Sequence, residues 1–158
     1  DFSCPPNAAF PGALDAALLM QESAKAAGID INVIREPDDG YWSNVWLKKP
    51  WSMCYWGGRP TVDTMLSISL AADAPWNDTH FKNARFNELL VQARSELDET
   101  KRAAMYAECQ QIVHDEGGQV VLMFYNFVGA LNTAVAHGEL NSDQDSDGGY
   151  MVERWWMA

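Results

Sequence analysis

The sequence predicts an α/β fold in which helices alternate with short, nearly uncharged strands along 158 residues. Apolar residues recur with helical spacing in several segments, and short apolar runs of strand length lie between them. Strands without charged residues are covered on both faces, so we expect a layered sheet flanked by helices. No internal repeat interrupts the chain, which predicts one compact unit over residues 1–158 with an irregular tail from about residue 132.

The N-terminal part contains two helix signals and two strand signals. Residues 11–27 are rich in Ala, Leu and Met and are followed by glycine, which predicts a helix. Residues 29–34 alternate apolar and polar side chains, as a half-buried strand does. A short helix is expected over residues 41–48. The aromatic run 51–56 predicts a buried strand that ends in a glycine loop.

The central part carries three helix signals. Thr61 is a candidate N-cap for a helix over residues 62–71, and a polar loop follows it. A second helix begins after Asn83, and Asp98 is a candidate N-cap for a third. The apolar stripes of the last two helices predict their buried faces: Phe86, Leu89, Leu90 and Ala93 on one, and Met105, Cys109, Ile112 and Val113 on the other. Residues 119–125 predict a further strand.

Composition excludes several classes of partner. The chain has 11 Lys and Arg against 22 Asp and Glu, and the net charge of −11 disfavours nucleic acid and anionic membranes. No apolar run approaches the roughly 18 residues that span a bilayer. The residues before Pro5 show no signal peptide. Cys4, Cys54 and Cys109 are too few for a zinc site or a disulfide scaffold, and a Cys4–Cys54 disulfide stays an open alternative.

No residue pattern predicts catalysis, a cofactor or a metal site. His80, His114 and His137 are not connected by spacing to a nucleophile or a carboxylate, so we do not expect an enzyme. The acidic turn from Asp143 to Gly148 matches the first half of a calcium loop, but Arg154 stands where the bidentate glutamate belongs. A solvated acidic turn is the favoured interpretation.

The glycine loop after the aromatic run is the candidate ligand site. Ligands of open α/β sheets bind beyond the carboxyl ends of strands, and an aromatic ring there can stack on a small molecule. Arg59 is either a clamp for a carboxylate or a surface arginine paired with Asp63. Trp46 and Trp51 are expected in the core. The candidate site residues are Tyr55, Trp56, Gly57, Gly58, Arg59 and Asp63.

The order of several segments also resembles a known family. These segments are KAAGIDINV, GYWSNVW, YWGGRP and PWNDTHFKNARFNELLVQARSELDETKRAAMYAECQQIVHDEGGQVVLMFYNF. Together they resemble the C-terminal lobe of the family-five extracellular solute-binding proteins, the peptide, opine and nickel type binding proteins of bacterial ABC importers. The similarity extends to about Val135, and its specificity lies in the order of the segments.

The resemblance implies a periplasmic, non-enzymatic receptor that holds a solute between two lobes and delivers it to a permease in the inner membrane. The ligand-contacting loop of the family corresponds to Tyr55, Trp56, Gly57, Gly58 and Arg59. Peptide-binding members commonly place an aspartate in this loop to hold the amino group of the ligand. This sequence has Arg59 and Pro60 instead, so we expect a peptide-like solute or a small solute with an anionic group.

The resemblance also implies a missing N-terminal lobe, because a complete family member has two lobes, two crossings between them and a signal peptide. One lobe alone is expected to bind weakly, since half of the cleft is absent. The alternative is a stand-alone module that uses exposed aromatic residues as a protein–protein surface.

Overall fold

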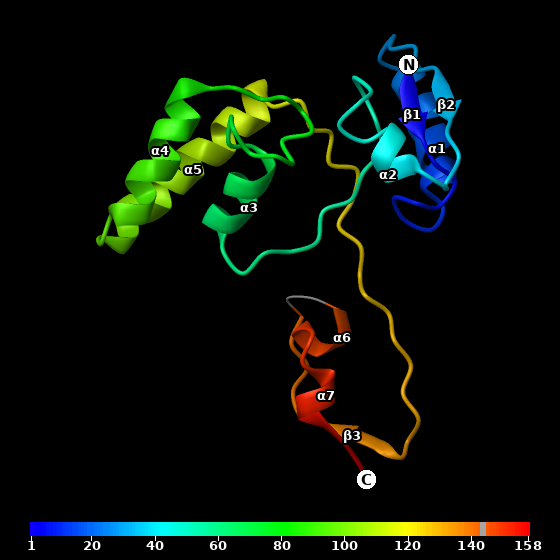
Figure 1. The fold of residues 1–158 in the computed structure, drawn as a ribbon, viewed down its shortest axis with the longest axis vertical. Helices are drawn as coiled ribbons and strands as arrows, with labels where there is room; N and C mark the ends of the chain where they lie inside the picture. Colours follow the sequence, from blue (N-terminus) through cyan, green and yellow to red (C-terminus); the bar gives the residue numbers. More distant parts are fainter. Residues whose placement is uncertain (143–144) are drawn as a thin grey trace. The chain divides into compact units, whose positions relative to one another are not determined.

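The computed structural model describes residues 1–142 and 145–158. Contacts divide the chain into two compact units. Figure 1 draws the helices and strands in chain order, from the N-terminus in blue to the C-terminus in red. Unit 1 comprises Asp1–Trp56 and Ile68–Ala84, and unit 2 comprises Gly57–Ser67 and Arg85–Ala158. Among the described residues, no helix has both the length and the apolar composition that a bilayer crossing requires.

Unit 1 is built on a small parallel sheet. Strand β1 (Phe2–Cys4) pairs with β2 (Val33–Arg35), so that Phe2 lies opposite Val33. Helix α1 (Ala13–Lys25) connects them, because parallel strands need a crossover. The buried faces of β1 and α1 meet in a core that also includes Ile31 and Met53. The predicted helix over residues 11–27 is therefore confirmed in its central part.

The predicted strand over residues 51–56 is wrong, and only Ser52 forms a β-bridge. Ser52 forms an isolated parallel bridge to Ser3, and the Met53 amide donates to the Ser3 carbonyl at 2.9 Å. Because β1 ends at Cys4, it offers no backbone partner to residues 54–56. Of the strand predicted over residues 29–34, only the last two residues are in a strand, because β2 comprises Val33–Arg35.

Helix α2 (Tyr41–Asn44) is shorter than the predicted helix over residues 41–48, and turns follow it. Its first residue, Tyr41, is buried and ties the helix to the sheet. The Tyr41 hydroxyl lies 2.7 Å from the Met53 carbonyl oxygen and 3.2 Å from that of Ser3. Burial, more than nearby charges, raises the pKa of Tyr41, so the phenol stays a donor.

We expect Tyr41→Phe to lower the free energy of unfolding by about 1–3 kcal/mol, because the Met53 carbonyl loses its donor inside the core. Urea denaturation followed by tryptophan fluorescence measures the change. Tyr55→Phe is the matched control, since Tyr55 is half exposed, and its effect should stay within about 0.5 kcal/mol. Equal effects of the two substitutions would contradict the role given to the Tyr41 hydroxyl.

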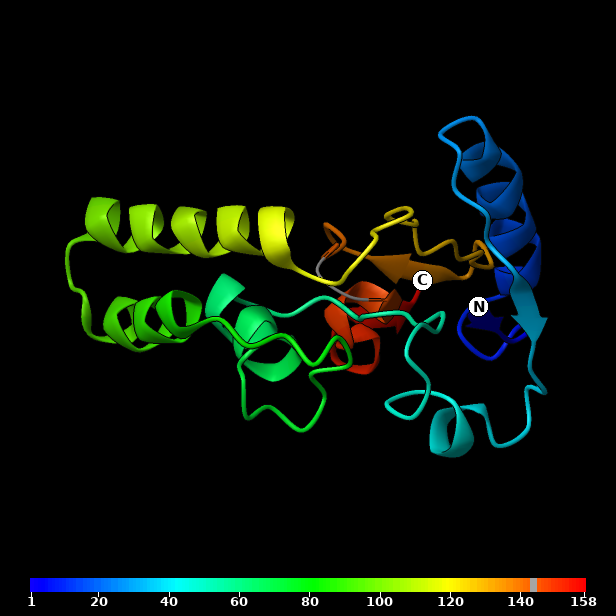
Figure 2. The same ribbon diagram turned by 90° about the horizontal axis from the view of Figure 1, so that it is seen from above.

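Unit 2 contains the longest helix of the described residues, which has 18 residues, and most of a second helix of 12 residues. Helix α4 (Ala84–Ser95) and helix α5 (Glu99–Glu116) run side by side in both ribbon views (Figure 2). The Asp98 carboxylate accepts the Lys101 amide at 3.1 Å, which confirms the predicted N-cap of α5. The predicted stripe of α4 is confirmed by burial of all four members: Phe86, Leu89, Leu90 and Ala93.

Arg85 links these two helices at their surface. Its Nε and Nη2 donate to the two carboxylate oxygens of Glu108 at 2.7 and 3.0 Å, and Nη1 contacts Glu88 at 3.3 Å. Within the interface, the Cys109 Sγ lies 3.9 Å from the Phe86 carbonyl oxygen. The α5 stripe is less buried than predicted: Cys109 is fully buried, whereas Met105, Ile112 and Val113 are half-buried.

Helix α3 (Val62–Ser69) begins as predicted after Thr61, whose hydroxyl accepts the Thr64 amide at 3.2 Å. This local bond satisfies one of the backbone donors that the first turn of any helix leaves unpaired. The predicted C-terminal end at residue 71 is two residues too long.

The strand predicted over residues 119–125 is wrong. These residues are extended without ladder pairing among the described part of the chain, and Phe124 is 95% exposed. An uncharged run has strand propensity, but a strand forms only where a neighbour supplies its hydrogen bonds. The prediction from composition assumed a neighbouring strand that the described residues do not provide.

The C-terminal segment has more structure than the sequence indicates. Strands β3 (Val135–His137) and β4 (Trp155–Met157) form an antiparallel pair around α6 (Asp145–Gly148) and α7 (Met151–Arg154). Asp147 is buried, accepts the Asn141 amide at 2.6 Å and the Trp155 indole Nε1 at 3.1 Å, and pairs with Arg154. The sheets of the described residues thus have two strands each and are smaller than the predicted layered sheet.

Candidate functional site

The boundary between the units divides the predicted site residues. Tyr55 and Trp56 are the last residues of the first segment of unit 1, whereas the glycine loop and Asp63 belong to unit 2. Each group has its own contacts within its unit.

Tyr55 and Trp56 belong to an aromatic cluster of unit 1. The cluster consists of Trp42, Trp46, Tyr55, Trp56 and Trp76. The Trp42 ring lies 5.6 Å from Tyr55 and 5.7 Å from Trp46, measured between centroids, and both contacts are edge-to-face. Trp76 continues the series at 6.3 Å from Trp46 and 6.2 Å from Trp56. These distances are within the range of attractive aromatic pairs, so the rings support one another.

Asp78 is hydrogen-bonded to one tryptophan of this cluster. Its Oδ2 accepts the Trp46 indole Nε1 at 2.9 Å and the Cys54 thiol at 3.4 Å. Burial, together with the Asp78 carboxylate, raises the pKa of Cys54 to about 12, so this thiol is neutral at physiological pH. The Asp78 carboxylate therefore accepts hydrogen bonds from an indole and a neutral thiol.

The Trp56 indole Nε1 is buried and has no hydrogen-bond acceptor of good geometry among residues 1–142 and 145–158. Its ring is nevertheless only half-buried, because it lies at the edge of the cluster. The indole is therefore held by ring contacts with Trp76 more than by a polar anchor.

In unit 2, Arg59 folds back on its own loop. Its Nη1 donates to the carbonyl oxygens of Gly57 at 3.0 Å and Gly58 at 3.1 Å. Arg59 forms no ion pair with any residue that the structure describes. Its two hydrogen bonds thus go to main-chain oxygens of the same loop, and its role as a carboxylate clamp stays a prediction.

Asp63 lies in the first turn of α3 and pairs with a different arginine from the predicted one. The Arg94 Nε donates to its two carboxylate oxygens at 2.9 and 3.1 Å, and Arg94 also hydrogen-bonds Ser67. The alternative in which Arg59 is a surface arginine neutralised by Asp63 is therefore wrong. Asp63 joins α3 to α4, and its place in the candidate site stays a prediction.

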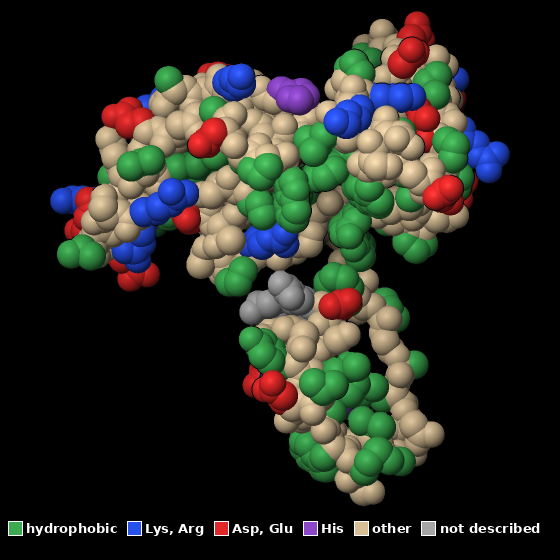
Figure 3. Space-filling view, viewed as in Figure 1, with side chains coloured by type: hydrophobic (Ala, Val, Ile, Leu, Met, Phe, Trp, Pro, Cys, Tyr) green, Lys and Arg blue, Asp and Glu red, His purple; other side chains and the backbone are tan. Residues whose placement is uncertain are grey.

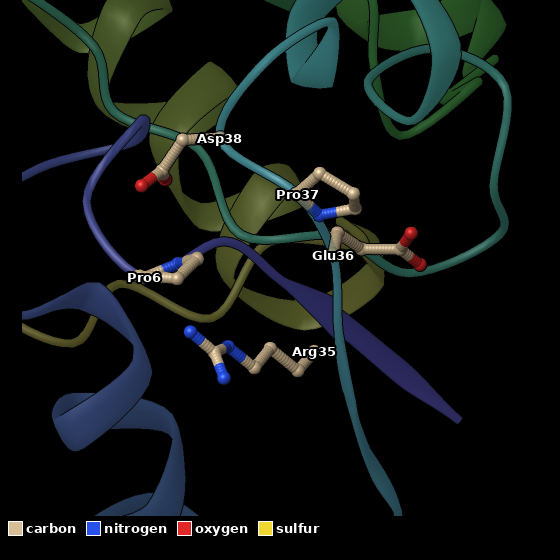
Figure 4. Close-up of a pocket in the computed structure, with 5 residues that line it drawn as sticks. All are labelled: Pro6, Arg35, Glu36, Pro37 and Asp38. Carbon is tan, nitrogen blue, oxygen red and sulfur yellow. The ribbon is translucent and has the colours of Figure 1, made fainter.

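A hollow on unit 1 carries polar groups that stabilise the fold (Figure 4). It is lined by Pro6, Arg35, Glu36, Pro37 and Asp38. Asp38 accepts the amides of Asn7 at 2.8 Å and Ala8 at 2.7 Å, and these bonds lower its pKa. Glu36 accepts from Ser3 and pairs with Lys49. Since its carboxylates already have partners, the hollow is a weaker candidate than the aromatic cluster.

The three histidines lie on separate elements. His80 is exposed in the loop before α4, His114 is exposed on α5 beside Asp115, and His137 lies on β3 against Trp155. The described residues contain no group of three His, Cys, Asp or Glu placed to hold a metal ion. Of the acidic turn, Asp147 is buried and paired, so it is not a solvated carboxylate as predicted. Asp143 lies outside the described residues.

Charged side chains are dispersed on the face drawn in Figure 3. Lys and Arg are separated there by acidic, hydrophobic and backbone atoms.

Sequence reasoning did not identify Asp78. The crowding of tryptophans was visible, but the hydrogen bond from Trp46 to Asp78 spans 32 residues, and no local spacing encodes it. Trp51, by contrast, packs on Phe2 with ring centroids 4.6 Å apart, as predicted for a core aromatic.

Comparison with known proteins gives one curated relative. No family model matches the chain. The chain is 30% identical over 77 residues to the Escherichia coli K12 protein named "Probable deoxycholate-binding periplasmic protein YgiS". The aligned part covers 49% of this chain and 14% of that protein. The chain therefore matches a small part of the length of its relative.

Three solved structures share the fold. They are NikZ from Campylobacter jejuni in complex with Ni(L-His), the unliganded open form of the periplasmic murein tripeptide binding protein MppA, and the periplasmic binding protein DppA from Helicobacter pylori with the peptide STSA. The TM-scores are 0.59, 0.63 and 0.59, with sequence identities of 16%, 18% and 21%. The matches cover 72%, 73% and 73% of this chain but 24%, 22% and 23% of those proteins.

These matches confirm at the level of the fold that the chain is similar to periplasmic solute-binding proteins. At identities below 25% they carry no residue assignments to this chain. The correspondence to a C-terminal lobe and the roles of the six predicted site residues stay predictions.

Proposed function

We propose that the chain belongs to the solute-binding component of an ABC importer and contributes one wall of its binding cleft. The observation that carries this proposal is the shared fold over nearly three quarters of the chain, with binding proteins for a nickel complex and for peptides among the matches. The relative named for deoxycholate binding adds independent support from sequence. In this proposal the protein works in the periplasm, a second lobe forms the opposite wall, and an inner-membrane permease receives the solute.

The proposed solute is peptide-like or a small molecule with a carboxylate. Arg59 supports this choice, because its guanidinium contacts main-chain oxygens and no acidic side chain among the described residues. A guanidinium can present two parallel donors to a carboxylate, and such charge-assisted bonds are stronger than neutral ones. Tyr55 and Trp56, which precede the loop in the chain, supply aromatic rings.

We expect Arg59→Ala to weaken binding of a carboxylate-bearing ligand at least tenfold, because a charge-assisted hydrogen bond contributes about 1.5–3 kcal/mol. Tryptophan fluorescence of the full chain, titrated with dipeptides, tripeptides, deoxycholate and the nickel–histidine complex, measures the affinities. Arg59→Lys should be intermediate, because it keeps the charge and loses the bidentate geometry.

Lys101→Ala is the control, since it removes an exposed positive charge from α5, outside the candidate site residues. Unchanged affinity in Arg59→Ala would show that the ligand is not held through its anionic group. Because one wall of the cleft alone is expected to bind weakly, each titration extends to millimolar ligand, and absence of saturable binding by every ligand class at these concentrations would contradict the proposed function itself.

A protein–protein interaction module is the second candidate function. The apolar side chains between Val120 and Leu131 favour it, because several are more than half exposed, including Val128 at 91%. Sedimentation velocity over a range of concentrations distinguishes the two functions. A module of this kind should associate in the absence of solute, whereas a solute receptor should respond to solute at constant mass.

A further inference from the structure

The hollow on unit 1 lies beyond the carboxyl ends of both parallel strands. β1 ends at Cys4, two residues before the lining residue Pro6. β2 ends at Arg35, which also lines the hollow, and the other lining residues follow directly at positions 36–38. Parallel strands end at the same edge of their sheet, and ligands of open α/β sheets bind beyond that edge. The hollow has a volume of about 330 Å³, which is large enough for a small molecule.

Arg35 supplies a guanidinium to this hollow. Its side chain is exposed, and it forms no ion pair and no side-chain hydrogen bond with any residue that the structure describes. By contrast, Arg85 and Arg94 in unit 2 are each paired with a carboxylate. A guanidinium has five N–H donors and no acceptor, so Arg35 can donate to an anion in the hollow without giving up an existing partner.

The two carboxylates of the hollow already have partners. Asp38 accepts two backbone amides of the loop after β1, and Glu36 pairs with Lys49. Figure 4 shows the Arg35 guanidinium on the side of Pro6 and the Glu36 carboxylate on the opposite side, because consecutive residues at the end of a strand point in opposite directions. Asp38 is therefore the acidic group of the hollow whose charge interacts with Arg35.

This arrangement of charges selects a single carboxylate. The planar fork of a guanidinium presents two parallel donors that match the two oxygens of a carboxylate. Arg35 compensates one negative charge, whereas a second charge finds no further free cation among the five lining residues and is repelled by Asp38. The rings of Pro6 and Pro37 are rigid and carry no N–H donor, so they offer apolar surface to the body of the ligand.

We propose that the hollow at the carboxyl ends of β1 and β2 binds a small monocarboxylate through Arg35. The carboxylate of the ligand accepts hydrogen bonds from the guanidinium, and its apolar body lies on Pro6 and Pro37. This site goes beyond the proposed function, because all its residues belong to unit 1, whereas Arg59 and its glycine loop belong to unit 2. The hollow thus binds its anion separately from the solute.

Benzoate and benzamide test the proposal, because they have nearly the same shape and differ in charge. The full chain is labelled with ¹⁵N and titrated with each probe to high millimolar concentration, and amide shifts in NMR spectra report both affinity and location. We expect benzoate to bind saturably, at least fivefold more tightly than benzamide, and to shift the amides of Arg35, Glu36 and Asp38. Equal affinities, or benzoate shifts that leave these amides unchanged, would overturn the proposal. Inorganic phosphate, mainly a dianion at pH 8, should bind more weakly than benzoate, and tighter binding would contradict the choice of a monocarboxylate.

Substitution of Arg35 locates the binding. Arg35→Gln removes the charge and keeps a polar side chain, so it should weaken benzoate binding at least fivefold and leave benzamide binding unchanged. Lys82→Gln is the control, since it removes another exposed positive charge from unit 1, outside the hollow, and it should not change either affinity. The Arg35 side chain is exposed and β2 pairs through its backbone, so the variant should fold, and circular dichroism checks this. Unchanged benzoate affinity in folded Arg35→Gln would overturn the assignment.

Arg59→Ala separates this site from the carboxylate clamp proposed in unit 2. It should leave the benzoate shifts of Arg35, Glu36 and Asp38 unchanged. If benzoate binding is lost in Arg59→Ala and kept in Arg35→Gln, the clamp holds the anion and the proposed site in the hollow is wrong. If benzoate binding requires Arg35 and no solute class binds to the chain, the site in the hollow stands and the proposed function is wrong.

Discussion

Replacing Phe86 by alanine is expected to lower the free energy of unfolding by about 3–5 kcal/mol. The side chain is fully buried on α4, and its backbone carbonyl is close to Cys109 on α5. Removing the ring forfeits its burial and leaves a cavity that neighbouring helices cannot fill without moving. Since single domains are stable by about 5–15 kcal/mol, this is a large share of the total.

Urea denaturation followed by far-ultraviolet circular dichroism measures the loss, because it reports directly on helix. Hydrogen exchange of the α4 and α5 amides should show the same destabilisation locally. Phe86→Leu should cost less, because it leaves a smaller void. Val91→Ala is the matched control on the same helix, since Val91 is 65% exposed, and its effect should stay within about 0.5 kcal/mol. A Phe86→Ala protein as stable as the control would show that the α4 interface is not the core of unit 2.

This prediction could be made from sequence alone, because the signals that define α4 and α5 are local. Four apolar residues at helical spacing identify the buried face of α4, and the Asp98 cap identifies the start of α5. Helix hydrogen bonds join residues four apart, so the information lies within a few turns of chain. Thr61 at the start of α3 is a further case.

The strands were harder to predict because their partners are distant. Phe2 pairs with Val33, and Ser3 bonds to the backbone of Trp51 and Met53, so the sheet of unit 1 joins three separate segments. β1 has no periodicity to reveal it and was not predicted. The run 119–125 has strand composition, yet no described segment pairs with it. Composition indicates which segments can form strands. A segment forms a strand only where another segment pairs with it through backbone hydrogen bonds.

The candidate site shows the same division between local and distant information. The glycine loop and Arg59 were visible in the sequence, and Trp56 was singled out because it enters that loop. The contacts of these residues were not visible. Asp63 binds Arg94, which lies 31 residues away, and Asp78 supports a cluster drawn from three segments. When the role of a residue depends on contacts with residues far away in the chain, the adjacent sequence does not reveal that role.

Cys54 is expected to react with iodoacetamide at pH 8 about a hundred- to a thousandfold more slowly in the native chain than in the urea-unfolded chain. Burial, and after it the charge of Asp78, raises the pKa of this thiol to about 12, and only the thiolate is a nucleophile. An unfolded cysteine has a pKa of about 8.5, so a substantial part of it is ionised at pH 8. Peptide mass spectrometry after timed quenching gives the rate for Cys54 separately from those for Cys4 and Cys109.

Slow alkylation has two physical causes, and the pH dependence separates them. If the raised pKa limits the rate, the native reaction accelerates about tenfold per pH unit from pH 8 to pH 10, while the unfolded reaction levels off above about pH 9. If steric access limits the rate, the native reaction levels off as well. Asp78→Asn should accelerate the native reaction and leave the unfolded rate unchanged, because it removes the charge and keeps an oxygen beside the thiol. A native rate that is independent of both pH and Asp78 would mean that the carboxylate does not act on Cys54.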